Sequence, residues 1–577
     1  MKRLAAFVAL LVAAACGRAA VPAFPGAEGF GAYATGGRSG DVYHVINLSG
    51  SASTPGSFAY GLANAPASGR TIVFDVSGNI PVSGNLTLGH SRITIAGQTA
   101  PGDGVGLISG TFWITGSENV IRHFRFRNGQ SADCIDITSS ATNTILDHCD
   151  VLFSKDENFS SFGSPPENLT FQWSANAWGL YSHSAGGLWD VNHATAHHTL
   201  WAHNHTRDPK AHPDGLLDWI NNVTCDYGIG FIMGDSTATA DWKANVEGCY
   251  FVCPPGNVRP YALSRAGVDS HGAPNFSLWL TNCLWDKDGD SILNGFDPGW
   301  SMVSVNPTNY HRMSNAIPRT HGIPVTQDPP LTAYKKIVSA VGPLRLDANH
   351  PEGLRDEVAA ELIKSVVTWR MDRFDSVADT GASGGGYGTL NSTPAPADTD
   401  RDGMPDFWES ALGSNPTVDD HTNAVPANAF IPNNPAGYTL LEEYLHFRAT
   451  PHAGRGTVVC RQSHLARRGS APLHQRLHQQ AARHLHALEH DQRRRHARRR
   501  QRRARRAGDE FLRARALRFY RDRRRWQFVD TNVSRAGVGG RAAAGFALER
   551  GWRDERLDHQ RAQLPCRVES HGVSRWR

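Results

Sequence analysis

Several classes of protein find little support in this sequence. After the first twenty residues, no apolar run approaches the roughly 20 residues that a membrane-spanning helix needs. No amphipathic helix of about 10–15 residues separates the strand-like runs, which argues against a doubly wound α/β fold. The nine cysteines are scattered, and Cys249 and Cys253 have no second pair to match them, so no zinc site is predicted. Glycine, in contrast, is abundant at 57 of 577 residues, which suits a fold with many turns.

The N-terminus is typical of an exported protein. Lys2 and Arg3 precede an apolar run over residues 4–15, and small residues follow it. We therefore predict a signal peptide over residues 1–20 and a secreted mature chain, with a lipid anchor at Cys16 as the alternative. An exported protein can form a disulfide such as Cys249–Cys253, but the apolar surroundings of the cysteines in the body of the chain favour buried free thiols.

Charge is divided unevenly along the chain. Residues 454–577 hold 32 arginines, no lysine and 11 acidic residues, a net charge of +21, whereas the rest of the chain has a net charge of −16. A basic tail can bind nucleic acid or an anionic surface, or be a solvated disordered segment. Arginine without lysine is better explained by a reading-frame error in a GC-rich gene. We base no function on the tail, residues 451–577, and predict no nucleic-acid partner.

Short apolar runs recur over residues 23–347, about 20–30 residues apart, with Gly, Asn, Ser and Asp between them. Examples are Thr71–Val76, Asn119–Phe126 and Thr144–Asp147. Such strands fit a solenoid, a sandwich or a propeller, and their rung-like recurrence favours the solenoid. We expect one flanking helix over residues 352–367. Residues 381–397, rich in Gly, Pro and Ala, have the composition of a linker.

Residues 398–409 match the EF-hand calcium loop at each required position. Oxygen atoms at positions 1, 3, 5, 9 and 12 and a carbonyl at position 7 surround one hard cation, and Gly403 permits the sharp turn. Prolines just before the loop exclude a preceding helix, so it resembles the loops of dockerins and thrombospondin type 3 repeats. We predict a structural Ca2+ site in a small module, residues 398–450; a solvated acidic turn is the alternative. The predicted ligands are Asp398, Asp400, Asp402, Met404, Asp406 and Glu409.

Three groups of segments carry a resemblance to one family. They are Ala23–Gly31 with Asp41–Val45, then Ile95–Gly104, and then the series Asp133–Asp136, Leu146–Cys149, Lys155–Glu157, His197–His198 and Thr206–Lys210. Together these segments resemble the bacterial pectate lyases over roughly residues 23–380. The resemblance implies an all-β, right-handed parallel β-helix over residues 21–380, and calcium-dependent β-elimination of an acidic plant cell-wall polysaccharide by a monomer.

The expected chemistry explains the acidic residues in that series. Lysis of a uronate chain removes the C5 proton beside the carboxylate and expels the C4 oxygen. A cation held against the carboxylate stabilises the negative charge that builds up. Calcium takes hard oxygen ligands. The resemblance implies that Asp133, Asp136, Asp156 and Glu157 are the ligands of this calcium ion. The alternative is that they are solvated turn residues.

The resemblance also makes Arg207 the catalytic residue. Because a guanidinium stays protonated in proteins, either nearby cations shift it strongly, or it stabilises charge while another group takes the proton. Lys210 is the nearest such group, as a base or a carboxylate clamp. His197, His198 and Lys155 are expected to contact substrate, although packing within the rungs is an alternative for the two histidines.

Two departures from the family pattern leave other functions open. Residues 182–187 contain no lysine where many relatives carry one, and residues 211–214 lack the usual second arginine. Lys155 or His212 could compensate. A β-helix glycoside hydrolase would need a carboxylate pair, for which Asp133 and Asp136 could serve. A non-catalytic glycan-binding β-helix would bind the polymer without turning it over.

Overall fold

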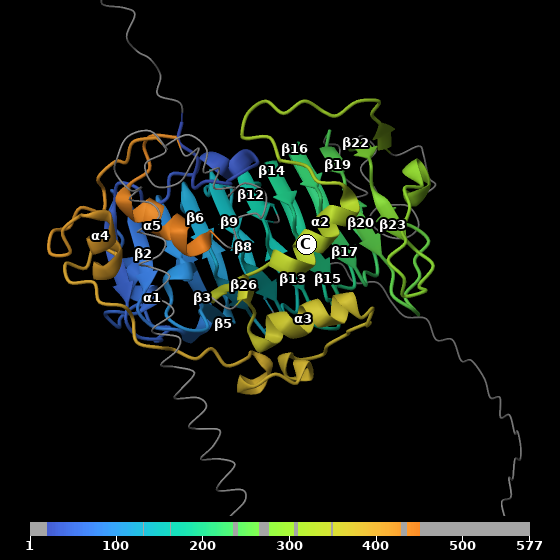
Figure 1. Ribbon diagram of the computed structural model, residues 1–577. Helices are drawn as coiled ribbons and strands as arrows, with labels where there is room; N and C mark the ends of the chain where they lie inside the picture. The colour runs from blue at the N-terminus through green and yellow to red at the C-terminus, as the bar shows by residue number, and fades with distance from the viewer. Residues whose placement is uncertain are drawn as a thin grey trace, which may run out of the picture. The chain divides into compact units, whose positions relative to one another are not determined.

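The computed structural model describes residues 20–450 except 131, 162, 235–240, 265–275, 305–309, 348–349 and 428–434. They belong to one compact unit, Met1–Asp491; the signal peptide, Cys16 and the arginine-rich tail predicted above lie outside the described residues. Parallel strands stack rung upon rung along this unit (Figure 1). The predicted parallel β-helix is confirmed.

The first sheet runs through the whole stack in nearly sequential order. Its strands pair in parallel, and each strand partners the equivalent strand of the next turn. The strands, in order, are β1 (Asp41–Val45), β2 (Arg70–Phe74), β4 (Ile93–Ala96), β6 (Asn119–Arg122), β9 (Thr144–Asp147), β12 (Leu169–Gln172), β14 (Leu188–His197), β16 (Lys210–Ile220), β19 (Lys243–Glu247), β22 (Phe276–Thr281) and β24 (Tyr310–Arg312), with β18 (Phe231–Met233) and β21 (Leu263–Ser264) joined at the side.

The second sheet is also parallel and interleaves with the first along the chain. Long strands bend between faces, so their two halves pair with different neighbours. Its members are β3 (Gly78–Leu88), β5 (Val105–Ile114), β7 (Arg125–Arg127), β8 (Ile135–Ile137), β10 (Asp150–Leu152), β11 (Phe159–Ser160), β13 (Ala175–Ala177), β15 (Leu200–Ala202), β17 (Val223–Cys225), β20 (Tyr250–Val252) and β23 (Leu284–Asp286).

The bent strands create a third face. The second half of β5 pairs with β8, and β8 pairs with β11. Backbone hydrogen bonds join β11 to the start of β14, where Phe159 N–H donates to Gly186 O over 3.1 Å and Ser161 N–H donates to Leu188 O over 2.9 Å. The first half of β14 then pairs with the first half of β16, and β16 with β18. We call this set of strands the third face; the candidate site lies at its edge.

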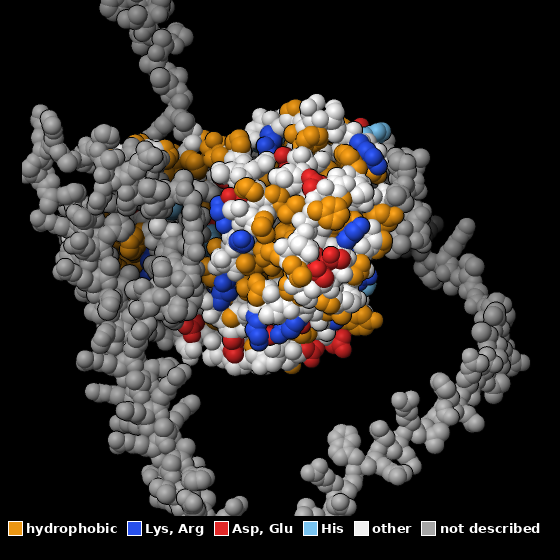
Figure 2. All heavy atoms as spheres, turned by 45° about the vertical axis from the view of Figure 1, so that its right-hand side comes forward, with side chains coloured by type: hydrophobic (Ala, Val, Ile, Leu, Met, Phe, Trp, Pro, Cys, Tyr) orange, Lys and Arg blue, Asp and Glu red, His pale blue; other side chains and the backbone are white. Residues whose placement is uncertain are grey.

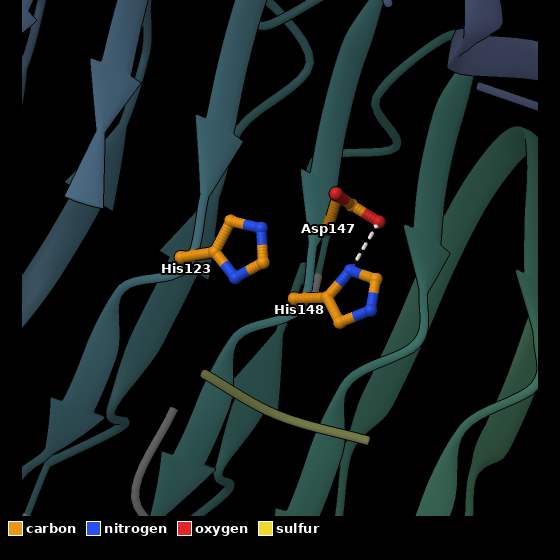
Figure 3. Close-up of side chains that lie close together, drawn as sticks. All are labelled: His123, Asp147 and His148. Carbon is orange, nitrogen blue, oxygen red and sulfur yellow. Dashed lines mark hydrogen bonds and ion pairs between the residues drawn. The ribbon is translucent and has the colours of Figure 1, made fainter. Parts of the chain in front are cut away.

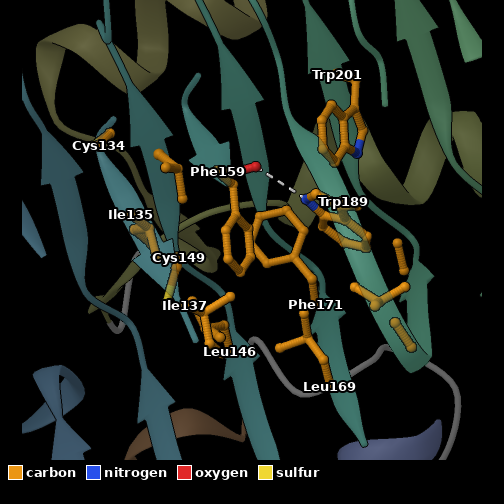
Figure 4. Close-up of a cluster of buried hydrophobic side chains, with 14 of the residues drawn as sticks. Cys134, Ile135, Ile137, Leu146, Cys149, Phe159, Leu169, Phe171, Trp189 and Trp201 are labelled. Carbon is orange, nitrogen blue, oxygen red and sulfur yellow. Dashed lines mark hydrogen bonds between the residues drawn. The ribbon is translucent and has the colours of Figure 1, made fainter. Parts of the chain in front are cut away.

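Aromatic and aliphatic side chains from all three faces fill the interior (Figure 4). Trp189, Trp201 and Trp219 are fully buried, with ring centroids 5.0–6.1 Å apart. Phe159 and Phe171 pack edge-on against this group. These three tryptophans are therefore core residues. The six cysteines among the described residues are buried and free, as predicted from their apolar surroundings.

Helices cover the outer surface of the second sheet. They are α2 (Pro330–Ala340) and α3 (Glu357–Val367) (Figure 1). Ile337, Val358 and Leu362 of these helices pack in one buried cluster with Val223 and other residues of that sheet. The sequence predicted one helix over residues 352–367 and missed α2. α3 begins only at Glu357, because residues 350–354 form β26 (His350–Leu354), which pairs with β25 (Arg345–Asp347).

Asp356 explains where α3 begins. Its carboxylate caps the helix by accepting from the Val358 and Ala359 N–H groups, and it also accepts from two buried guanidiniums, Arg125 at 2.7 Å and Arg127 at 3.0 Å. The nearby guanidiniums hold the pKa of Asp356 below its ordinary range despite burial, which alone would raise it. The network ties the helix to β7.

The remaining helices are short. α1 (Phe58–Ala63) is capped by Ser57, whose side chain accepts from Tyr60 N–H. α4 (Asp406–Leu412) begins within the predicted calcium loop, and α5 (Leu440–Ala449) follows later in the chain. Both pack against Ala96 and Val42 of the first rungs. Among the described residues, every helix is too short or too polar to cross a bilayer.

The segment predicted as a linker, residues 381–397, lies along the β-helix. The Tyr387 hydroxyl donates to Asn128 O over 2.9 Å, and Asn391 N–H donates to the Asp103 carboxylate over 2.9 Å. On the face shown in Figure 2, hydrophobic, basic and acidic side chains are interspersed among the described residues. That face therefore carries no broad field of one charge.

Candidate functional site

Successive turns bring the predicted catalytic segments into one column at the edge of the third face. Isolated parallel bridges join Glu157 to Ala185 and Ala185 to Thr206. Backbone hydrogen bonds continue the column: Cys134 N–H donates to Glu157 O over 3.0 Å, and Gly186 N–H donates to Thr206 O over 2.9 Å. Residues from four turns are thus neighbours in space.

The acidic members of the column lie near one another: Asp133 is close to Asp156 and Asp136, and Asp156 is close to Glu157. Asp133 Oδ1 accepts from the Glu157 N–H over 2.9 Å. Burial, together with the nearby charges of Asp156 and Asp136, raises the pKa of Asp133 to about 7. Burial also raises the pKa of Asp136, against a hydrogen bond from the Trp113 side chain that lowers it. The structure therefore brings the four predicted calcium ligands together and concentrates negative charge there.

Two basic side chains contact this acidic group. The Arg207 guanidinium forms an ion pair with Glu157, and His183 Nδ1 lies 2.7 Å from Asp156 Oδ1. His183, Asp156 and Glu157 each offer a ligand atom within 4.8 Å of the others. Arg207 has a left-handed backbone conformation with φ of +62°, which non-glycine residues adopt at a cost. His183 is a member of the site that the sequence reasoning did not single out.

Lys210 and Lys155 lie at the margins of the acidic group. Gly187 joins the backbones of Arg207 and Lys210, since its N–H donates to Arg207 O over 2.7 Å and its carbonyl accepts from Lys210 N–H over 2.8 Å. Lys210 is half-buried at the start of β16, and Lys155 is exposed beside Asp156. His212, named as a substitute for missing cations, is bound to Asp190 at 2.5 Å and stacks on Trp242 at 4.3 Å.

A ladder of buried amides supports the column from beneath. Asn158 donates to Asn176 Oδ1 over 3.1 Å and to Asn204 Oδ1 over 3.3 Å, and Asn204 donates to Asp208 Oδ1 over 2.8 Å. Asn176 also donates to the Gly186 carbonyl over 2.8 Å. Asn158 follows Glu157, and Asp208 follows Arg207, so the ladder fixes the backbone beside both. Burial raises the pKa of Asp208 well above its ordinary value. The sequence reasoning missed these asparagines, although their recurrence in successive turns was a visible signal.

His197 and His198 do not line this site, contrary to expectation. They are 1% and 2% exposed, and they lie where β14 ends and the chain turns toward the second sheet. His198 stacks on Trp173 at 4.5 Å and binds Asp328 over 3.1 Å. The reason is the rung period: His123, His148, Trp173 and His198 are 25 residues apart, all with left-handed φ, and form one stacked corner.

The same corner contains a second cluster of metal-ligating types, His123, Asp147 and His148 (Figure 3). All three are buried. Asp147 Oδ1 accepts from Gln172 and contacts His148 Nδ1, and Asp147 Oδ2 accepts from the Arg122 guanidinium, each at 2.8–2.9 Å. Burial alone would raise the pKa of Asp147, but the adjacent His148 and the Arg122 guanidinium hold it well below its ordinary value. Because both oxygens of the carboxylate are already engaged by these contacts, we assign the cluster to packing of the corner.

The loop over residues 398–409 forms a second acidic group. Asp398 accepts from Arg401 and Gly403 N–H groups, Asp400 from Asp402 N–H, and Asp402 from Met404 N–H. Glu409 is fully buried, and neither carboxylate oxygen has a hydrogen-bond partner among the described residues. Burial and the surrounding carboxylates raise the pKa of Glu409 to about 8.

Comparison with known proteins identifies the family. A scan against protein-family models finds no match. The probable pectate lyase C of Aspergillus fumigatus is 33% identical over 434 residues, covering 73% of this chain and 93% of that protein. The probable pectate lyase C of Aspergillus terreus is 34% identical over 434 residues with the same coverage. This chain belongs to the pectate lyase family. A solved structure of a pectate lyase from Bacillus sp. N165, in complex with trigalacturonate, aligns at a TM-score of 0.39 and 14% identity over 55% of this chain and 98% of that one.

Pectate lyases typically use Ca2+, and both acidic groups of this pectate lyase fit that ion. Each consists of hard carboxylate oxygens, the donors that calcium prefers. In each group, burial and the repulsion between carboxylates raise carboxyl pKa values. A bound divalent cation would offset this negative charge and lower those pKa values again. The buried oxygens of Glu409 that lack hydrogen-bond partners among the described residues are the strongest single indication.

Proposed function

We propose that this pectate lyase family member cleaves polygalacturonate by calcium-dependent β-elimination at the column of Asp133, Glu157 and Arg207. The observation that carries the proposal is the meeting of four carboxylates with one guanidinium on adjacent turns. Solvated turn residues, the alternative, would not be stacked in register with a buried amide ladder beneath them.

We assign a separate role in the reaction to each group of residues. Asp133, Asp136, Asp156 and Glu157 would hold Ca2+, which when bound withdraws charge from the substrate carboxylate and acidifies the neighbouring C5–H. Arg207 stabilises the charge that develops on the substrate. The proton goes to Arg207 or to Lys210, the two groups joined through Gly187. Arg207 must lose its proton to act as the base, which the ion pair with Glu157 opposes, so we assign the base to Lys210.

The side chains that we propose to contact substrate differ from the expectation based on His197 and His198. His183 contacts Asp156, and the exposed Lys155 precedes Asp156 in the chain. We propose that they contact substrate carboxylates in place of the lysine missing from residues 182–187. The pectate lyase family is typically extracellular, and we propose secretion for this chain through residues 1–20.

Product analysis distinguishes elimination from its rivals. Polygalacturonate digested briefly in water enriched in heavy oxygen, and reduced at once so that the new reducing ends cannot exchange oxygen with water, should give fragments without that isotope, each cut leaving one unsaturated end. A glycoside hydrolase would incorporate heavy oxygen at every cut, and that result would overturn the proposal. A binding protein would retain the polymer and release no fragments.

We also propose a structural calcium site in the loop over residues 398–409. The support is Glu409, a wholly buried carboxylate without hydrogen-bond partners among the described residues, enclosed by Asp398, Asp400 and Asp402. Calcium should raise the melting temperature of the full chain, and part of that rise should vanish in Glu409→Gln. An unchanged calcium response in Glu409→Gln would contradict this site without bearing on the catalytic one.

A further inference from the structure

Asp420 lies against the calcium loop although it is far outside the twelve-residue pattern. It follows α4 by several residues, and its N–H donates to Asp402 Oδ2 over 3.2 Å. This hydrogen bond holds its backbone at the fifth position of the loop. Asp420 Oδ1 is buried and has no hydrogen-bond partner among the described residues.

Asp406, the ninth position of the loop pattern, is engaged elsewhere. Its Oδ1 accepts from the Thr399 N–H over 2.8 Å, and its Oδ2 accepts from the Thr399 hydroxyl over 2.9 Å. Both oxygens are therefore used to join the second position of the loop to the first residue of α4. The pattern leaves one ligand position without the residue that normally supplies it.

A separate observation supports a bound ion in this cluster. Glu409 is fully buried, and both of its carboxylate oxygens lack hydrogen-bond partners among the described residues; Asp400 Oδ2 is buried in the same state. Groups so placed need a compensating partner, because a buried carboxylate without one is costly. Asp420 adds another carboxylate beside Asp400 and Asp402.

We propose that Asp420 is a ligand of the structural calcium ion and takes the place in the ligand set that the loop pattern gives to Asp406. This inference rests on the proposed calcium site of residues 398–409 and names a residue that the loop pattern does not contain. Five carboxylates, those of Asp398, Asp400, Asp402, Glu409 and Asp420, then surround the ion.

Asp420 also links the proposed ion to parts of the structure outside the loop. The next residue, His421, lies with Nε2 at 3.0 Å from Gly40 O, immediately before β1, and its carbonyl accepts from Leu441 N–H in α5. An ion bound by Asp420 therefore fastens α5 and the first rung of the β-helix to the loop. We expect calcium to protect the backbone of this segment, as well as the loop itself, from hydrogen exchange.

The test is calorimetric calcium titration of the full-length chain, with every variant carrying Asp133→Asn to suppress binding at the catalytic group. Asp420→Ala should weaken binding at the loop by about tenfold or more, since calcium affinity follows the number of charged ligands. Asp419→Ala is the matched control: Asp419 is the adjacent carboxylate, its side chain is 60% exposed, and it pairs with His421. That variant should bind within about threefold of the parent.

Asp406→Ala and Glu409→Gln separate the possible failures. If Asp406→Ala weakens binding as much as Asp420→Ala, or if Asp420→Ala binds like the parent, the assignment of Asp420 is wrong. If Glu409→Gln also binds like the parent, the calcium site itself is wrong. Asp420→Asn, which keeps one carbonyl oxygen, should fall between Asp420→Ala and the parent; this graded loss would not follow from damage to folding alone.

Discussion

Replacing Arg207 tests the catalytic assignment in detail. Its guanidinium is 24% exposed and pairs with Glu157, which is 7% exposed, so the charge acts in a partly dehydrated setting. Removing one charged donor aimed at a developing anion costs about 3 kcal/mol of transition-state stabilisation, or a hundred- to a thousand-fold in kcat. Arg207→Ala should therefore lose about that factor. Arg207→Lys keeps the charge but not the planar fork, and should lose less.

Calcium binding must respond in the opposite sense. Because Arg207 and calcium compete for the Glu157 carboxylate, Arg207→Ala should bind calcium as tightly as the parent or more tightly. The assay combines initial rates on polygalacturonate at saturating calcium with a calcium titration of the same variant. The reasoning is refuted if kcat stays within a few-fold of the parent, or if the loss is fully restored by raising calcium.

Three further predictions follow from the same structure. The raised pKa values of Asp133, about 7, and Glu409, about 8, mean that the calcium-free native state holds protons that the unfolded chain has lost. Its melting temperature should therefore fall as pH rises from about 4.5 to 8, and saturating calcium should remove that fall. Trp219→Ala empties a fully buried site and should cost about 3–5 kcal/mol in denaturant unfolding, with no change in calcium affinity. In Gly186→Ala the new Cβ would come within 2.6 Å of the carbonyl oxygen of Arg207, the proposed catalytic arginine. We expect kcat to fall while the protein stays folded at the assay temperature. Gly89→Ala, whose nearest neighbouring atom would be 3.7 Å away, should leave kcat and the melting temperature unchanged.

The fold could be predicted from the sequence because each turn of a parallel β-helix repeats the strand pattern of the turn before it. Arg122, Asp147, Gln172 and His197 are register partners in successive turns, and their 25-residue spacing is visible in the sequence once the first pair is aligned. α2 was missed because its amphipathic pattern is weaker than that of α3, a helix of the same length that was predicted. Its face is apolar only where it meets the second sheet.

The candidate site was accessible in part. The carboxylates and Arg207 could be chosen from motif order, and the structure brings them together. The environment of each residue depends on register, which motif order does not contain. His197 and His198 match a family motif, yet the 25-residue period puts them in a buried corner. Likewise the loop pattern includes Asp406, but only the folded chain reveals that Thr399 occupies its oxygens.

The most direct test of the account is the ultraviolet absorbance of unsaturated uronide during digestion of polygalacturonate by the full-length chain. We predict a steady rise with calcium, no rise after calcium is chelated, and recovery when calcium is restored. Absence of a rise at any calcium concentration, from folded protein that still binds the polymer, would contradict β-elimination. The function would then be that of a glycan-binding β-helix.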